Sequence, residues 1–245
     1  MARFKSINDI VTQVAIETGI PKTQSIFASP DSSYEQLISL ANSCGYELLQ
    51  SFDWQAVNRS HTIVTKSTDS GKYPLPDDFA YMIDQTSWEQ KENVPVGNLS
   101  PQEWTYLLGR DLVSYTIYAS FRLNQNQIWI FPYANSNQNP PDGLEITFEY
   151  ISRNWVLEGG VPDQYADACR TESDVVLYEP YLFERLLKVR FLEARGFDST
   201  VATQQMVAAF NSWSGKDKSA PVLSAGPSGS RDNYLGNVPD TGFGL

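Results

Sequence analysis

The stretch from residue 73 to residue 155 constrains the fold most, because its aromatic and β-branched residues alternate with polar ones. Successive side chains of a β-strand point to opposite faces, so this period of two is typical of a half-buried antiparallel sheet. In the segment 145–152, Ile146, Phe148 and Tyr150 all fall on one face. The sequence therefore predicts a β-rich region in the middle of the chain.

A β-hairpin is predicted inside this region. Residues 121–123 and 128–130 have strand character, and residues 124–126 between them are polar residues that tolerate a positive φ. The strand-like segment 145–152 follows the hairpin in sequence. We expect the three strands to continue as a meander.

Apolar residues at helical spacing mark segments on both sides of the β-rich region. Two helices are expected before it and two after it, and amphipathic helices with broad apolar faces need one another to bury them. The sequence predicts an α+β fold: an antiparallel helical bundle with an inserted β-rich domain of meander or hairpin type and an extended C-terminal tail. The expected boundaries are 1–55 and 161–214 for the bundle, 56–160 for the inserted domain and 215–245 for the tail.

Composition limits the classes of protein to which this fold can belong. The chain has 245 residues, 41% of them hydrophobic, which is enough for one or two domains. It contains no apolar run long enough for a membrane span and no signal-peptide pattern, so we expect no membrane partner. Cys44 and Cys169 lack a CxxC partner, which favours a reducing cytoplasm over a disulfide framework. The net charge of −11 disfavours general binding of nucleic acid.

No group of residues in the sequence has the pattern of a catalytic site. The sequence contains no Gly-rich phosphate loop, no HExxH, no GxSxG and no cluster of metal ligands. His61 is the only histidine, and Asp77 and Asp78 are adjacent, so on an extended chain they point in opposite directions. Cys44 lies on a helical apolar stripe and is expected to be a packed thiol. We therefore expect no enzyme activity, no cofactor and no metal.

The segment 215–245 is rich in Gly, Ser, Pro, Asn and Asp. Alone it cannot bury enough apolar area to offset the entropy lost on ordering, so we expect it to order against another subunit or partner. Its apolar residues are spaced like anchors, and we expect these five to make that contact: Leu223, Tyr234, Leu235, Phe243 and Leu245.

Several short motifs follow one another in an order that resembles the head-to-tail adaptor proteins of podovirus-like, short-tailed bacteriophages. The motifs are a Pro-Asp-Asp-Phe turn at 76–79, Thr-Ser-Trp at 86–88, Ser-Pro-Gln-Glu-Trp at 100–104, the hairpin at 121–132 and Phe-Glu-Tyr-Ile-Ser at 148–152. The resemblance spans roughly residues 1–213 and is strongest from 73 to 155. It rests on structural signatures, so it identifies no active site.

The resemblance implies a virion protein in the neck of the particle, present in the host cytoplasm during assembly. Such adaptors form a ring of about twelve copies beneath the portal protein, extend the channel for double-stranded DNA and dock the tail nozzle or tail fibres. A ring of about twelve would carry roughly −130 charges, which suits a channel through which DNA passes without specific binding. For the portal contact we choose the five tail anchors. Contacts within the ring or with the nozzle are expected at Trp88, Trp104, Trp129 and Tyr133, although the tryptophans serve equally well as sheet core.

Two alternatives remain open at this point. Within a phage particle, the protein could be the tail nozzle or another neck protein one layer further from the portal. From a different class, an aromatic-rich sheet with acidic groups could be a carbohydrate-binding module or a cell-wall glycoside hydrolase, in which sugars stack on aromatic faces.

Overall fold

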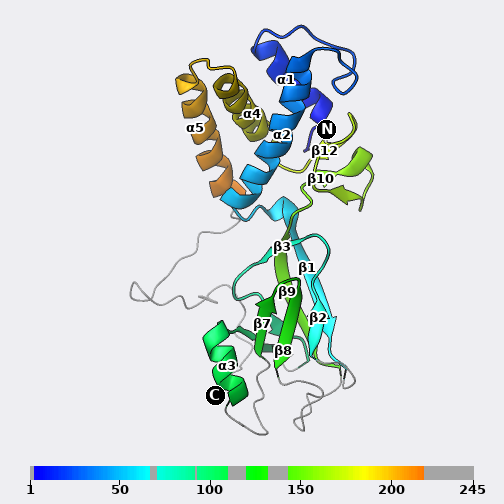
Figure 1. Cartoon of the computed structure of the whole chain (residues 1–245), viewed down its shortest axis with the longest axis vertical. Helices are drawn as coiled ribbons and strands as arrows, with labels where there is room; N and C mark the ends of the chain where they lie inside the picture. Colours follow the sequence, from blue (N-terminus) through cyan, green and yellow to red (C-terminus); the bar gives the residue numbers. More distant parts are fainter. Residues whose placement is uncertain (1–2, 67–70, 92, 110–119, 132–142, 218–245) are drawn as a thin grey trace.

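The computed structural model describes residues 3–66, 71–91, 93–109, 120–131 and 143–217. Within these residues it is a mixed α+β protein with five α-helices and several β-sheets. Four of the helices gather at one end of the molecule, and most strands lie at the other end with the fifth helix (Figure 1). The helices are α1 (Ile7–Glu17), α2 (Ser32–Ser51), α3 (Pro101–Gly109), α4 (Pro180–Ala194) and α5 (Thr200–Asp217).

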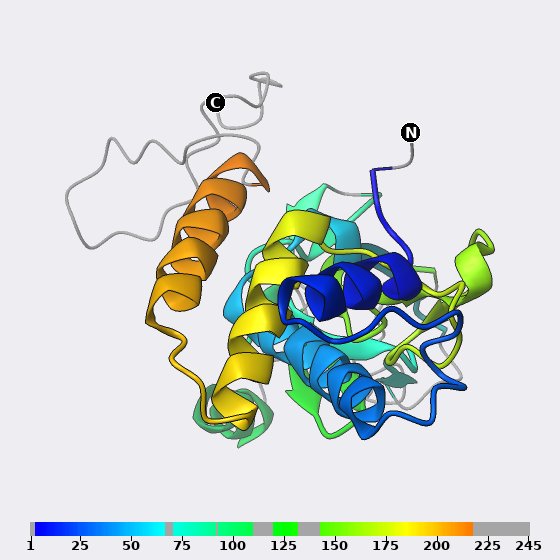
Figure 2. The same ribbon diagram turned by 90° about the horizontal axis from the view of Figure 1, so that it is seen from above.

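Helix α4 is the centre of the helical end, because α1, α2 and α5 all pack against it. Seen from above, α5 lies on one side of α4, and α1 and α2 lie on the other (Figure 2). Ion pairs reinforce this packing: Glu17 of α1 accepts from Arg185 at 2.6 Å and Lys188 at 2.9 Å, and Arg190 pairs with Glu47 of α2. The four helices were expected from the sequence.

The helix termini follow local rules. Ser6 caps α1 by accepting from the backbone N–H of Asp9, and Asp31 caps α2 by accepting from that of Ser33. Asp198 likewise accepts from the backbone N–H of Thr200 at the start of α5. Helix α5 continues through Asp217, so the first three residues of the expected tail belong to the helix.

The strands form three sheets within the described residues. The first contains β1 (Asn58–Val64), β9 (Glu145–Ser152), β4 (Trp88–Glu89) and β5 (Val94–Pro95) in that order, with β3 (Phe79–Met82) also paired to β9. The second has the order β2 (Lys72–Pro74), β8 (Gln127–Phe131), β7 (Ser120–Asn124) and β6 (Gly97–Asn98). A small third sheet beside the helices contains β11 (Tyr165–Ala166), β10 (Val156–Leu157) and β12 (Val175–Val176).

The predicted hairpin is confirmed, but its continuation as a meander is wrong. Strands β7 and β8 pair through a turn at Gln125 and Asn126, and Gln125 has a φ of 56°. Strand β9 pairs with β1, β3 and β4 and lies in a different sheet from β8. Its partner β1 comes from far earlier in the chain, a choice made by packing that a local pattern of alternation cannot reveal.

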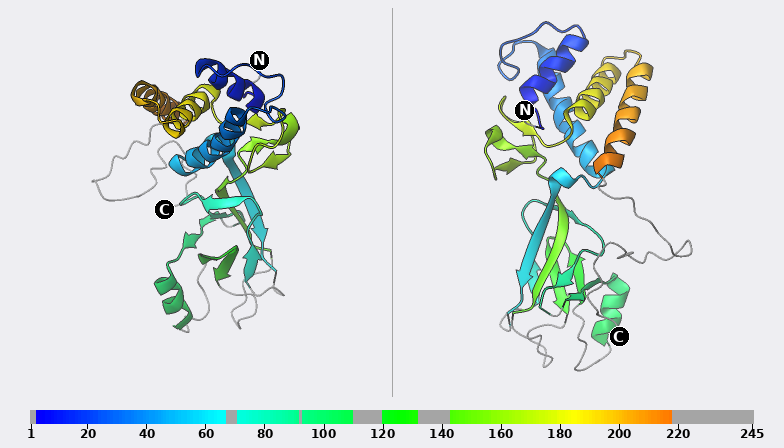
Figure 3. Two further views of the ribbon diagram at one scale, coloured as in Figure 1. Left: turned by 45° about the horizontal axis from the view of Figure 1, so that its top comes forward. Right: turned by 180° about the vertical axis from the view of Figure 1, so that it is seen from behind.

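The described residues bury two separate hydrophobic cores. The first lies among the helices and draws its residues from 7–57 and 151–209, and Trp155, Tyr178 and Phe183 form its aromatic centre. The second lies among the strands and draws its residues from 63–150. Strands β1 and β9 run from one core to the other (Figure 3).

Candidate functional site

The predicted site residues separate into those that the structure describes and those that it does not. The five tail anchors and Tyr133 lie outside the described residues. The three tryptophans Trp88, Trp104 and Trp129 are described, and each has a different environment.

Trp104 is a core residue with 2% of its surface exposed. It projects from α3, whose start is fixed by a reciprocal capping box: Ser100 N–H donates to the Glu103 carboxylate at 2.8 Å, and Glu103 N–H donates to Ser100 Oγ at 3.2 Å. The Trp104 ring lies 6.4 Å from that of Trp129 and 6.3 Å from that of Phe131, centroid to centroid. This placement fits the core role that the sequence left open.

Trp129 is half-buried on β8 and already engaged by neighbours. Lys72 Nζ lies 4.4 Å from the centre of its ring, and the Arg122 guanidinium lies 6.0 Å away. The indole N–H donates to Gln127 Oε1 at 3.3 Å. Two cationic side chains therefore already lie against this ring.

Trp88 is the most exposed of the three, with 36% of its surface accessible. It pairs across the first sheet with Thr147 of β9, which in turn pairs with Thr62 of β1. Cross-strand partners share a face of the sheet, so these side chains form one row. The hydroxyls of Thr62 and Thr147 are hydrogen-bonded to each other at 2.8 Å. Val64, 47% exposed, lies on the same face two residues along β1. We call Thr62, Val64, Trp88 and Thr147 the outer sheet face.

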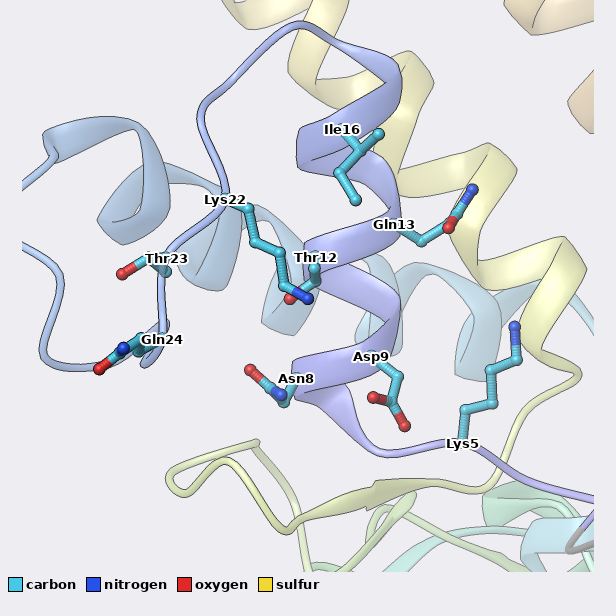
Figure 4. A pocket seen from close by; sticks show the side chains of 9 residues that line it. All are labelled: Lys5, Asn8, Asp9, Thr12, Gln13, Ile16, Lys22, Thr23 and Gln24. Carbon is cyan, nitrogen blue, oxygen red and sulfur yellow. The ribbon is translucent and has the colours of Figure 1, made fainter.

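A second accessible region is a groove of about 820 Å³ between α1 and the segment that follows it, shown in Figure 4. Its lining is mostly polar and uncharged. The lining residues are Lys5, Asn8, Asp9, Thr12, Gln13, Ile16, Lys22, Thr23 and Gln24.

Two of the side chains that line this groove are held by neighbouring carboxylates. Lys5 is held by Glu184 at 2.9 Å, and Gln13 donates to Glu17 at 3.3 Å. No described residue takes a hydrogen bond or ion pair from the side chain of Lys22. The other charged lining residues are Asp9 and Lys22, and the uncharged polar side chains beside them can both donate and accept hydrogen bonds.

Burial shifts the pKa values of the titratable groups in the interior. Burial, together with the negative charge of Glu47, raises the pKa of Cys44 to about 12, so this thiol is protonated at neutral pH. Burial also raises the pKa of Cys169 and lowers that of His61. The prediction that Cys44 is a packed thiol is confirmed by its complete burial. Across the described ranges, no three His, Cys, Asp or Glu side chains are grouped as metal ligands would be.

Sequence reasoning did not identify the groove beside α1. It also did not single out the exposed side of α5, where Val201 and Val207 are exposed and where the run from Thr200 to Gly215 contains no charged residue. The outer sheet face was predicted only at Trp88, because its other members come from strands whose pairing is long-range.

No protein-family model matches this chain, and no curated protein matches it in sequence. In the part of the chain that the structure describes, no helix is both long and apolar enough to cross a bilayer.

Proposed function

We propose that this protein is a structural component of a tailed-phage particle: a head-to-tail adaptor that forms a ring beneath the portal, extends the DNA channel and docks the tail nozzle or fibres. In this proposal the helical end is an antiparallel bundle and the strand-rich end is a domain inserted into it. Residues 218–245 form the tail that reaches the portal, with Leu223, Tyr234, Leu235, Phe243 and Leu245 as its anchors.

The observation that carries the proposal is the division of the buried residues into two cores. The helical core is built from residues that precede and follow the strand-rich segment in the sequence. The second core is built from the strands of that segment. A protein at a joint must contact partners on more than one side, and two cores joined by β1 and β9 give it two separate ends to do so. The motif order in the sequence supports the same assignment.

The outer sheet face supports a partner at the strand-rich end. A Trp and a Val that are 36% and 47% exposed lie on the same sheet face as a threonine pair. Interfaces are enriched in aromatic residues, and charged residues such as Glu145 and Glu149, which flank Thr147 on this face, are typical of their rims. We assign this face to the tail-side partner and the tail anchors to the portal.

The mass of the complex with portal rings tests the proposal. Full-length protein is mixed with assembled cognate portal rings, beside a chain that ends at Asp217, the last residue of α5. We expect full-length chain to add to the portal in about twelve copies and the shortened chain to add none. A matched Trp88→Ala variant should still bind the portal but lose the tail-side partner. If full-length protein leaves the mass of the portal unchanged, the adaptor assignment is wrong.

The exposed Trp88 also favours a second candidate function, a carbohydrate-binding surface, because sugars stack on exposed aromatic rings. Calorimetric titration with cell-wall oligosaccharides discriminates the two. Heat of binding that is lost in Trp88→Ala would favour the glycan-binding function, whereas portal binding without glycan binding would favour the adaptor. Contact with the portal itself also separates an adaptor from a tail nozzle or other neck protein.

A further inference from the structure

The outward side of α5 is an unusual surface for this protein. Helix α5 lies at the edge of the helical end and packs mainly on α4, and many of its residues on the other side are exposed. Val201 is 65% exposed and Val207 46% exposed, and the polar residues between them, including Gln204, are exposed as well. From Thr200 to Gly215 the helix has no charged residue, in a chain of which 19% of residues are charged.

The missing charge identifies the kind of partner that fits this face. A chain with a net charge of −11 repels its own copies, so a contact between identical copies is favoured only where both surfaces lack like charges. A basic partner would instead be matched by acidic side chains, and α5 offers none before Asp217. The uncharged face of α5 therefore fits a second copy of this chain.

The groove beside α1 supplies a complementary surface. Asn8, Thr12 and Gln24 line it with side chains that have no hydrogen-bond partner among the described residues. The α5 face carries Gln204 and Asn211, whose side-chain amides can both donate and accept such bonds. Helix α1, which lines the groove, and α5 lie on opposite sides of α4 (Figures 1 and 2). They can thus meet between two copies without competing within one.

We infer that the outward face of α5 docks into the α1 groove of a second copy, and that repetition of this head-to-tail contact builds the ring. For the closure of the ring, this inference rests on the proposed function. The contact between two copies does not depend on that function. A contact between two different surfaces is heterologous, and heterologous contacts give rings when the rotation closes.

The size of the contact predicts its strength. An 18-residue helix is about 27 Å long and about 10 Å wide, so its face covers a few hundred Å², less than the roughly 800 Å² per partner of a standard interface. Free copies should therefore associate weakly, whereas a closed ring of many such contacts, assembled on the portal, should be stable.

Cysteine cross-linking tests the contact directly. Cys44 and Cys169 are buried, so single cysteines introduced as Gln204→Cys on α5 and Thr12→Cys in the groove are the accessible thiols. Under mild oxidation at about 1 mM protein, with and without cognate portal, we expect the mixture of the two variants to form mixed dimers and each variant alone to form almost none. Dimers of Gln204→Cys alone would indicate an α5–α5 contact and overturn the inference, as would the absence of mixed dimers in both conditions.

A charge variant gives a second measurement. Gln204→Lys with Ala208→Lys should weaken self-association at least tenfold in sedimentation velocity, because two positive charges would face Lys22 of the groove. The matched control is Gln50→Lys with Ala194→Lys, which adds the same charge at exposed positions of α2 and α4 and should leave association unchanged. Equal effects of the two pairs would refute the α5 contact. Intact mixed cross-links without portal binding would instead refute the adaptor function alone.

Discussion

Gly45 is the residue at which packing leaves least room. It lies inside α2, where glycine costs about 1 kcal/mol relative to alanine, and a Cβ at this position would overlap the ring of the fully buried Trp155. We expect Gly45→Ala to lower the free energy of unfolding by about 1–3 kcal/mol despite its better helix propensity. Urea unfolding followed by tryptophan fluorescence measures the change.

Gly215→Ala in α5 is the matched control, because a Cβ there has no atom within 4 Å. This substitution should leave stability unchanged or raise it by up to about 1 kcal/mol. If both substitutions change the free energy of unfolding equally, the Trp155 ring does not lie against Gly45 in solution and the close approach is wrong.

Glu17 makes the helical end sensitive to acid. Burial opposes its ionisation, but hydrogen bonds from Lys188 and Arg185 outweigh burial and lower the pKa of Glu17 to about 2 from 4.5. A carboxyl with a lowered pKa stabilises the folded state fully above its unfolded pKa, and this contribution is lost as the pH falls from about 4.5 towards 2. The native protein should thus lose about 1–2 kcal/mol more than Glu17→Gln over that range.

The free energies of unfolding in urea at pH 7 and at about pH 2.5 check this expectation. Glu35→Gln, an exposed position on α2, serves as the control and should follow the native protein at both pH values. An identical acid loss in the native protein and in Glu17→Gln would show that this ion-pair cluster contributes nothing to acid stability.

Among the elements, β9 depends on a carboxylate outside its own strand. Asp78 accepts hydrogen bonds from the hydroxyls of Tyr150 at 2.9 Å and Ser152 at 2.6 Å, and its backbone carbonyl accepts from Arg153 N–H at 2.7 Å. From the sequence, this aspartate was placed only in the Pro-Asp-Asp-Phe turn at 76–79. In the structure its side chain fixes the end of a strand more than seventy residues away.

Removal of this carboxylate should destabilise the first sheet. We expect Asp78→Ala to cost about 2–3 kcal/mol, because two hydroxyls lose a charged acceptor in a partly buried place. Asp77→Ala is a matched control at the adjacent, exposed residue and should cost under about 0.5 kcal/mol. Chemical denaturation of both variants measures the difference, and equal losses would contradict the role given to Asp78.

The same elements explain what sequence reasoning could find. The helices and the β7–β8 hairpin were predictable because helical periodicity, capping residues and a polar turn are local signals. The pairing of β9 with β1 was not, because it joins segments about ninety residues apart, and β4 and β5 are too short to show any alternation. For the candidate site, sequence alone could not separate exposed Trp88 from buried Trp104, since packing decides exposure.

At the scale of the whole molecule, the pairing of β1 with β9 is the link between the two cores. Its register runs from Asn58 opposite Ile151 at the helical end to Val64 opposite Glu145 at the strand-rich end. Ile151 belongs to the helical core and Ile63 to the other, so one ladder contributes to both. The two cores are therefore built from different residues but joined without a flexible linker.

This architecture predicts that the helical core can fold without the strand-rich end. Ser60 and Glu149 are opposite each other in the ladder, so residues 61–148 can be replaced by Asn-Gly, a sequence suited to a two-residue hairpin turn. The shortened chain loses the Asp78 contacts and the packing of Ile83, which should lower its stability by a few kcal/mol. We expect helical far-UV circular dichroism and one cooperative thermal transition.

A second variant of the shortened chain shows whether that transition reports on the helical core. Leu187 is fully buried at the centre of α4. Leu187→Ala should therefore lower the free energy of unfolding of the shortened chain by a further 2–5 kcal/mol, about the cost of removing a buried leucine side chain, and so lower the temperature of the transition. A shortened chain with helical signal but no cooperative transition would show that the helices need the second core to pack. The protein would then be a single folding unit, and the strand-rich end could not be an inserted domain in the thermodynamic sense.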